Sequence, residues 1–186
     1  MRLLFGLLAT LAMAPGCADA GVGGFDYAPQ YDFSEFYAAT NNKTFQVIVS
    51  GNPFPSLSPE NIRNRLLPVL QVNRPRPRLT FTYTPPAERP HPWYRLVLVF
   101  DPANDLTATR VCSNQIAHKP GLAGHVDLFA VYCRNDQMMS QAVASAVGSA
   151  PEDPEIGRMF RHLFLVLFTD QPLMRRHHDN IPLIFR

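Results

Sequence analysis

The chain has little cysteine, no marked excess of either charge and no long hydrophobic run. Three cysteines in 186 residues exclude a small disulfide-dense scaffold, in which many bridges replace a hydrophobic core. Seventeen Lys and Arg residues stand against fifteen Asp and Glu residues, so the chain lacks the basic balance typical of nucleic-acid-binding proteins. No run reaches the roughly 20 apolar residues that a membrane-spanning helix needs. Residues 156–168 come closest, and Arg158, Arg161 and His162 interrupt them.

Motifs of the common catalytic and metal sites are missing as well. The sequence contains no Gly-x-Ser-x-Gly elbow, phosphate-binding loop, His-Glu-x-x-His helix or Cys-x-x-Cys pair. His177-His178-Asp179 has metal-ligating residue types, but its position beside two arginines near the C-terminus favours a solvated tail. We therefore expect no metal and no cofactor.

The remaining candidates for chemistry are single side chains. His118 and His125 flank a glycine-containing loop, and together with Cys112 they are the residues from which a thiol active site would be built. A turn is the simpler interpretation of Asp101, which precedes a proline, and a helix N-cap is the simpler interpretation of Asp136. The sequence therefore favours a protein that is not an enzyme, and we assign no catalytic residue.

The first twenty residues have the pattern of a secretory signal. Arg2 precedes an apolar run, residues 3–13, which is followed by a Pro-Gly breaker and small residues. Ala14-Pro15-Gly16-Cys17 resembles a bacterial lipobox, in which the cysteine is lipidated and becomes the N-terminus. Ala18-Asp19-Ala20 instead fits ordinary signal peptidase, which leaves a soluble chain. Both interpretations predict an exported protein, periplasmic or lipid-anchored to a bacterial membrane, and we favour lipidation at Cys17.

The chain beyond residue 20 divides into three parts. Residues 21–42 form an arm rich in aromatic residues, which we expect to dock on the domain by burying large apolar side chains. Residues 43–172 are long enough for a single α+β domain with its own core. Residues 173–186 form a C-terminal tail.

Hydrophobic periodicity predicts the elements of this domain. Alternation predicts strands at residues 45–49, 79–84, 94–100 and 126–133, with an edge strand or loop at 107–112. Ser58 caps a helix that begins at Pro59 and that Pro68 should kink or end. Asp136 is expected to cap a helix through residues 141–147, and Asp153 to cap a last helix with an apolar stripe over residues 156–167. The predicted fold is a two-layer α+β sandwich, a largely antiparallel sheet of about 4–5 strands packed by about 2–3 helices.

Two segments resemble a family of uncharacterised bacterial envelope proteins, periplasmic or lipid-anchored. One comprises Val99-Phe100 before an Asp-Pro turn, Cys112, and the run Tyr132-Cys133-Arg134-Asn135-Asp136 that leads to Met139-Ser140. The other comprises Asp153-Pro154-Glu155 followed by Met159-Phe160 and Leu167-Phe168. The resemblance covers residues 43 to about 172. It implies a signal or lipid anchor, two matched cysteines and a small α+β domain, and it implies no known reaction.

Cys112 and Cys133 are the pair available for a disulfide in an oxidising compartment, once Cys17 is lipidated or removed. A bridge needs their Cα atoms within about 7 Å. If residues 107–112 and 125–133 formed a simple hairpin, Cys133 would lie roughly 20 Å from Cys112, at about 3.3 Å per residue. The bridge and the hairpin therefore exclude each other. We favour the bridge, with residues 113–124 returning along the sheet.

Three functions remain open. We favour extracytoplasmic binding or support of an envelope assembly, with an envelope protein or a small apolar ligand as partner, no nucleic acid, and membrane contact only through a lipid anchor at Cys17. The first alternative is an envelope hydrolase with a Cys/His site formed by Cys112, His118 and His125. The second is a carrier that holds a small apolar ligand between the sheet and the last helix.

Overall fold

The computed structural model describes residues 20–88 and 90–172. The expected signal segment up to residue 19, which includes Cys17, lies outside the described residues, and so does the tail with His177-His178-Asp179. Among the described residues, no helix is both long enough and apolar enough to cross a membrane.

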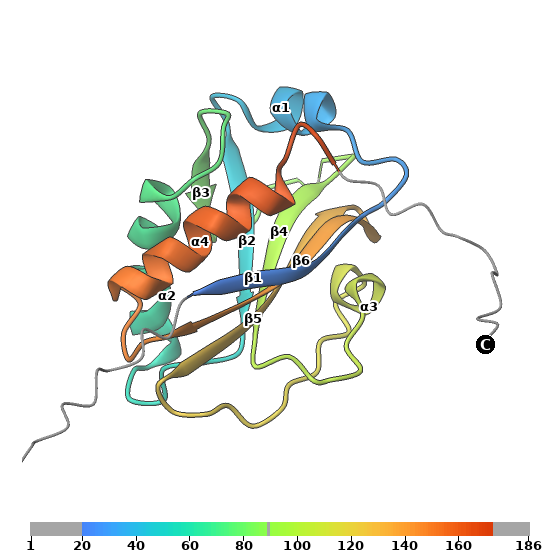
Figure 1. Ribbon diagram of the computed structural model, residues 1–186. Helices are drawn as coiled ribbons and strands as arrows, with labels where there is room; N and C mark the ends of the chain where they lie inside the picture. The colour runs from blue at the N-terminus through green and yellow to red at the C-terminus, as the bar shows by residue number, and fades with distance from the viewer. Residues whose placement is uncertain (1–19, 89, 173–186) are drawn as a thin grey trace, which may run out of the picture.

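The described residues form a six-stranded sheet and four helices (Figure 1). In chain order the elements are β1 (Gly21–Tyr27), α1 (Phe33–Thr40), β2 (Thr44–Ser50), α2 (Pro59–Val72), β3 (Thr80–Thr82), β4 (Tyr94–Phe100), α3 (Ala108–Cys112), β5 (His125–Arg134), β6 (Gln137–Val147) and α4 (Pro154–Leu167). The order of strands across the sheet is β1-β6-β5-β4-β2-β3. The pairs from β1 to β4 are antiparallel, whereas β2 runs parallel to both β4 and β3.

The predicted α+β class is confirmed, but the predicted sheet was wrong in two respects. It has six strands rather than four or five, and it is mixed rather than largely antiparallel. Adjacent parallel strands need a crossover of a dozen or more residues, usually a helix. α2 provides that crossover between β2 and β3.

The largest error concerns residues 137–147, which were predicted as a helix capped by Asp136. They form β6, which pairs with β5 on one side and β1 on the other. Asn135 and Asp136 make the two-residue turn that precedes β6, and Asn135 has a φ of 52°, the positive value that tight hairpin turns require. Buried alanines at 142, 144 and 146 alternate with outward residues, which is the period of a strand.

Two local predictions also need correction. Residues 108–112 form the short helix α3 rather than an edge strand or loop, and the Thr107 hydroxyl caps it by accepting from the Arg110 N–H at 3.4 Å. Pro68 does not end α2, which continues to Val72. Because Pro68 is exposed, water can bond the Asn64 carbonyl that the missing N–H leaves without its helical partner.

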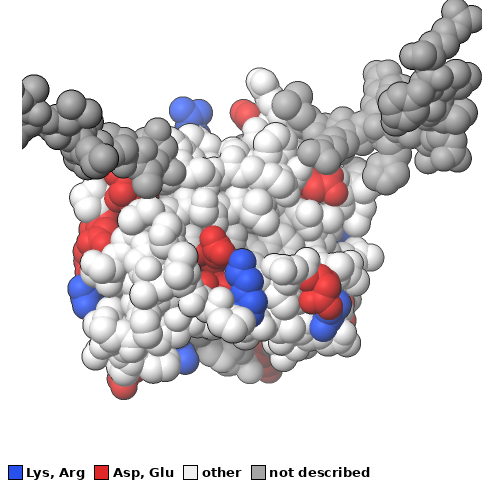
Figure 2. Space-filling view, turned by 60° about the horizontal axis from the view of Figure 1, so that its bottom comes forward, with Lys and Arg blue, Asp and Glu red and all other residues white. Residues whose placement is uncertain are grey.

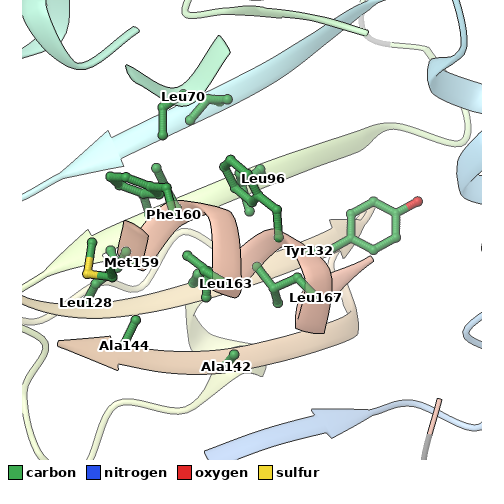
Figure 3. Packing of buried hydrophobic residues seen from close by; sticks show 14 of the residues in the cluster. Leu70, Leu96, Leu128, Tyr132, Ala142, Ala144, Met159, Phe160, Leu163 and Leu167 are labelled. Carbon is green, nitrogen blue, oxygen red and sulfur yellow. The ribbon is translucent and has the colours of Figure 1, made fainter. Parts of the chain in front are cut away.

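α2 and α4 lie side by side across one face of the sheet (Figure 1). The predicted apolar stripe of α4 is confirmed, because its residues are at most 1% exposed: Ile156, Met159, Phe160, Leu163, Phe164 and Leu167. Figure 3 shows Phe160 and Leu163 of α4 pointing toward the sheet, where Leu96 and Ala142 lie. A small ligand between the sheet and α4 would have to displace these side chains.

The aromatic segment at residues 21–42 contributes β1 and α1. Tyr27 and Tyr31 are buried, and their hydroxyls donate to the carbonyls of Val166 (2.6 Å) and Thr169 (2.8 Å) at the end of α4. The pairing of β1 with β6 shifts register just after Gly23. At this shift Gly24 has a φ of 54°, and an added Cβ would lie 2.8 Å from Val143 Cγ2, so the close approach of the two strands requires glycine.

α3 and a disulfide cover part of the opposite face of the sheet. The Cα atoms of Cys112 and Cys133 are 5.7 Å apart and their sulfurs are bonded, which confirms the predicted bridge and excludes the simple hairpin. Arg95 is buried beside them, and its guanidinium donates to the Cys112 carbonyl at 2.5 Å and to the Asn135 carbonyl at 2.7 Å. One side chain therefore joins α3 to the β5–β6 turn.

Candidate functional site

Three arginines lie on the short segment that links α2 to β3. Arg74, Arg76 and Arg78 alternate with two prolines, and a residue that precedes proline is restricted to extended conformations. The chain bends at residues 76–77. All three arginines are exposed, whereas Pro77 and Leu79 are buried. Three guanidinium groups therefore face solvent from one short stretch of backbone.

Hydrogen bonds to α1 and α2 hold this segment in place. The Asn42 N–H donates to the Arg78 carbonyl at 2.5 Å, and the Arg78 N–H donates to Asn41 Oδ1 at 3.2 Å. On the α2 side, the Gln71 amide donates to the Leu79 carbonyl at 2.9 Å. Figure 1 shows the link between α2 and β3 reaching the same end of the sheet as α1. The arginines thus stand on backbone that is fixed at its C-terminal end.

The arginines line an open cleft of about 710 Å³. The other lining residues come from α1 and the turn after it, from the end of α2, and from the two prolines: Tyr37, Asn41, Asn42, Val72, Pro75 and Pro77. We call this hollow the arginine cleft. Its volume falls within the range of about 300–1,000 Å³ that is usual for small-molecule sites.

No carboxylate of the described residues forms an ion pair with these three arginines. Every ion pair found in that part of the chain uses another cation: Arg65, Arg110, Lys119, Arg134 or Arg158. Arg74 donates to the Gln71 carbonyl at 3.2 Å, and Asp170 lines an adjacent hollow with Arg76 without pairing with it. The cleft is therefore locally positive in a chain of nearly balanced charge. Guanidinium groups bind phosphate and carboxylate with two parallel hydrogen bonds.

Exposed apolar side chains surround the same cleft. Tyr37 is 45% exposed and Val72 is 80% exposed, and both line it. Leu165 is 67% exposed and lines the adjacent hollow that includes Arg76. These are three of the six large hydrophobic side chains that are exposed in the described part of the chain. Arginine beside exposed apolar residues is typical of surfaces that contact anionic membranes.

A different face of the molecule carries charges in another pattern. Figure 2 turns the lower end of Figure 1 toward the viewer, and most of the surface that it shows is uncharged. Several Lys or Arg side chains there lie directly beside Asp or Glu side chains. Such pairs cancel locally, which distinguishes this face from the arginine cleft.

The histidines considered in the sequence do not meet a free thiol. The Cys112 sulfur is bonded to Cys133, so the thiol site that would combine Cys112 with His118 and His125 is not assembled. His118 instead contacts Ser50 and the Phe100 carbonyl, at the end of β2 opposite the arginine cleft. Among the described residues, no group of three or more His, Cys, Asp or Glu side chains is arranged to hold a metal ion.

Asp101 lies in a turn, as predicted, and is almost fully buried. Its φ is 48°, its N–H donates to the Asp127 carbonyl, and its carbonyl accepts from the Lys119 N–H, both at 2.9 Å. Burial, and then the charge of Asp127, raise the pKa of the Asp101 carboxyl. Lys119 Nζ lies 2.8 Å from Asp127 Oδ2, and this hydrogen bond raises the pKa of Lys119.

Sequence reasoning missed both the arginine cleft and Ser50. The near balance of charges over the whole chain concealed a local cluster, although the alternation of arginine with proline was a signal that could have revealed it. Ser50 carried no local signal, because its partner His118 is 68 residues away in the sequence.

No protein-family model matches the chain, and no curated protein matches it. One solved structure with some likeness is the PelC dodecamer from Paraburkholderia phytofirmans, at 11% sequence identity and a TM-score of 0.38, over 82% of this chain and 99% of that chain. At this identity and TM-score, the likeness carries no argument about function.

Proposed function

We propose that this protein is an exported accessory protein of the bacterial envelope that binds anionic lipid head groups in the arginine cleft. The observation that carries the proposal is the set of three guanidinium groups that line one cleft of about 710 Å³ and have no carboxylate partner within residues 20–88 and 90–172. This partner differs from the envelope protein or small apolar ligand expected from the sequence. It also adds a second membrane contact to the anchor expected at Cys17.

The chemistry of the cleft suits a phosphate-bearing head group at a membrane surface. Each guanidinium can donate two parallel hydrogen bonds to phosphate oxygens, and Arg or Lys near an anionic surface contributes about 1 kcal/mol to binding. Val72, Tyr37 and Leu165 can enter the interface between head groups and acyl chains while the arginines engage phosphates. A soluble anion would use the guanidinium groups but would leave these apolar side chains in water.

Two features support an extracytoplasmic location. The N-terminal sequence has the charged, apolar and small-residue order of a secretory signal. The domain also contains a buried disulfide between Cys112 and Cys133, and such bridges persist mainly in oxidising compartments. The resemblance to envelope proteins, periplasmic or lipid-anchored, agrees with this location.

The proposal predicts that binding to anionic vesicles depends on the cleft. We expect the Cys17→Ser protein to co-sediment with vesicles that contain phosphatidylglycerol and not with pure phosphatidylcholine vesicles. Changing Arg74, Arg76 and Arg78 to Gln together should weaken this binding by on the order of 100-fold, from about 1 kcal/mol per arginine. Binding should also weaken as salt rises, because salt screens exposed charges.

A matched control removes the same amount of charge elsewhere. Arg65, Arg110 and Arg158 are each ion-paired with a carboxylate, and changing all three to Gln should leave most of the vesicle binding intact. Equal losses of vesicle binding in the two triple variants would mean that net charge alone attracts the protein to the vesicles. Undiminished binding by the cleft variant would contradict the proposal.

The anchor expected at Cys17 gives a separate prediction. If Cys17 is lipidated in the bacterial host, the mature protein should partition into the detergent phase of a phase-separating detergent, and Cys17→Ser should move it into the aqueous phase. Mass spectrometry of the mature N-terminus provides the measurement. An unmodified chain that begins at Gly21 would refute lipidation and leave the cleft as the membrane contact to be tested.

A further inference from the structure

We propose that Ser50 and His118 act as nucleophile and general base in the hydrolysis of small carboxylic esters. This activity goes beyond head-group binding and uses the end of the sheet opposite the arginine cleft. Ser50 is the last residue of β2, and Phe100 is the last residue of the parallel neighbour β4. In open sheets, ligand sites form outside the carboxyl ends of parallel strands.

The hydrogen bonds of His118 define where the protons lie. Nδ1 is 2.9 Å from the Phe100 carbonyl oxygen, and Nε2 is 3.0 Å from Ser50 Oγ. A carbonyl oxygen only accepts hydrogen bonds, so Nδ1 carries a proton. In the neutral ring Nε2 is then an acceptor, and the Ser50 hydroxyl donates to it. This is the arrangement in which a base activates a serine and a third group orients the base.

The local backbone is shaped to allow this arrangement. Gly51 follows Ser50 with a φ of 89°, and an added Cβ would lie 2.5 Å from the Phe100 carbonyl oxygen and 3.1 Å from His118 Cε1. Only glycine leaves room for both the imidazole and the carbonyl that orients it. On the other side, His118 pairs with Pro102 in an isolated antiparallel bridge, which holds the loop of residues 101–124 against the end of the sheet.

The dyad is accessible to a substrate. Ser50 is half-buried and His118 is exposed, so the bond between them lies at the surface. Pro102 pairs with His118, and Lys119 follows His118 in the chain. Both residues also line a groove of about 440 Å³ that includes Val143. Neither Ser50 nor His118 lines this groove, which adjoins the dyad only through Pro102 and Lys119.

The reaction balances with water as the only co-reactant. Ser50 Oγ bonds to the carbonyl carbon while its proton passes to His118 Nε2, and the bond from that carbon to the alcohol oxygen breaks as His118 protonates the departing alcohol. Water then attacks the acyl-serine and gives a proton to Nε2. Cleavage of the acyl bond to Ser50 releases the carboxylic acid, and the proton returns to Oγ.

Labelling and turnover test the nucleophile directly. A fluorophosphonate probe should modify Ser50, as mapped by peptide mass spectrometry, and the protein should hydrolyse p-nitrophenyl acetate above the buffer rate. Ser50→Ala should abolish both. His118→Gln should reduce turnover by about 100-fold or more, the usual contribution of a general base. Ser113→Ala, at an exposed serine after α3, should change neither.

A thiol in place of the hydroxyl tests the role of His118 without relying on turnover. In Ser50→Cys, the pH dependence of iodoacetamide alkylation should show a thiol pKa at least one unit below its usual value of about 8.5. Adding His118→Gln should restore the usual value. A thiol pKa that is unaffected by His118 would show that the histidine only supports the loop.

Absence of fluorophosphonate labelling in protein that retains its disulfide and its melting temperature would overturn the inference. That result would leave vesicle binding untouched. Loss of vesicle binding without loss of labelling would instead contradict only the proposed head-group site. The two proposals therefore fail separately.

Discussion

Replacing Phe164 by alanine should lower the free energy of unfolding by about 3–5 kcal/mol, the usual cost of removing a buried aromatic ring. The ring is 1% exposed and lies 5.4 Å from the ring of Phe81 and 5.8 Å from that of Phe160, measured between centroids. Because α4 and the sheet meet at these rings, little can collapse into the space that the alanine leaves. Urea denaturation followed by circular dichroism measures the change.

Leu165 is the matched control on the same helix. It follows Phe164 directly and is 67% exposed, so Leu165→Ala should change the stability by no more than about 0.5 kcal/mol. A loss below about 1 kcal/mol for Phe164→Ala would mean that the apolar stripe of α4 does not carry the packing against the sheet.

Removing the disulfide should lower the free energy of unfolding by the second-largest amount. Changing Cys112 and Cys133 together to alanine should destabilise the domain by about 3 kcal/mol on the chain-entropy estimate for a loop of this length. For a domain of this size, that corresponds to a fall in melting temperature of roughly 6–12 °C. The bridge spans 21 positions of sequence and joins α3 to β5, so the unfolded chain gains freedom when it is absent.

The reduced wild-type protein separates the bridge from the loss of buried sulfur. Both cysteines are at most 1% exposed, so alanine also removes packing atoms, whereas reduction keeps them. We expect the reduced protein to melt at or slightly above the temperature of the double variant. Two titratable thiols in the purified, unreduced protein would contradict the bridge.

The elements that could be predicted are those whose signals are local. The strand at residues 94–100 was predicted with the bounds that β4 has, because a run that is apolar on both faces suits the centre of a sheet. The start of α2 followed from a capping serine and a proline, and Ser58 Oγ does accept from the Asn61 N–H at 3.2 Å. The stripe of α4 followed from its 3.6-residue period.

The elements that were missed depend on partners far away in the chain. The residues of β6 include three alanines, which favour helices, and only pairing with β5 and β1 makes them a strand. β1 contains three glycines and has little intrinsic preference for a strand. Position in the sheet therefore overrode local preference in both cases.

The candidate sites differ in the same way. The arginine cleft rests on the alternation of arginine with proline in five consecutive residues, so its cationic character is visible in the sequence. The nearly balanced charge of the whole chain gives no sign of this local cluster. The pairing of Ser50 with His118 depends on the loop that follows β4 returning to the end of β2. No spacing or motif in the chain predicts that return.

The pairing of the first strand with the last has a consequence for the order of folding. Gly21 lies opposite Ser145, and contacts between residues so distant in sequence form late because a long loop must close first. A chain that emerges N-terminus first holds β1 without a partner until residues 137–147 have followed. Before then β5 has an uncovered edge, and uncovered strand edges recruit other chains. The arrival of β6 both protects β5 and gives β1 its place in the sheet.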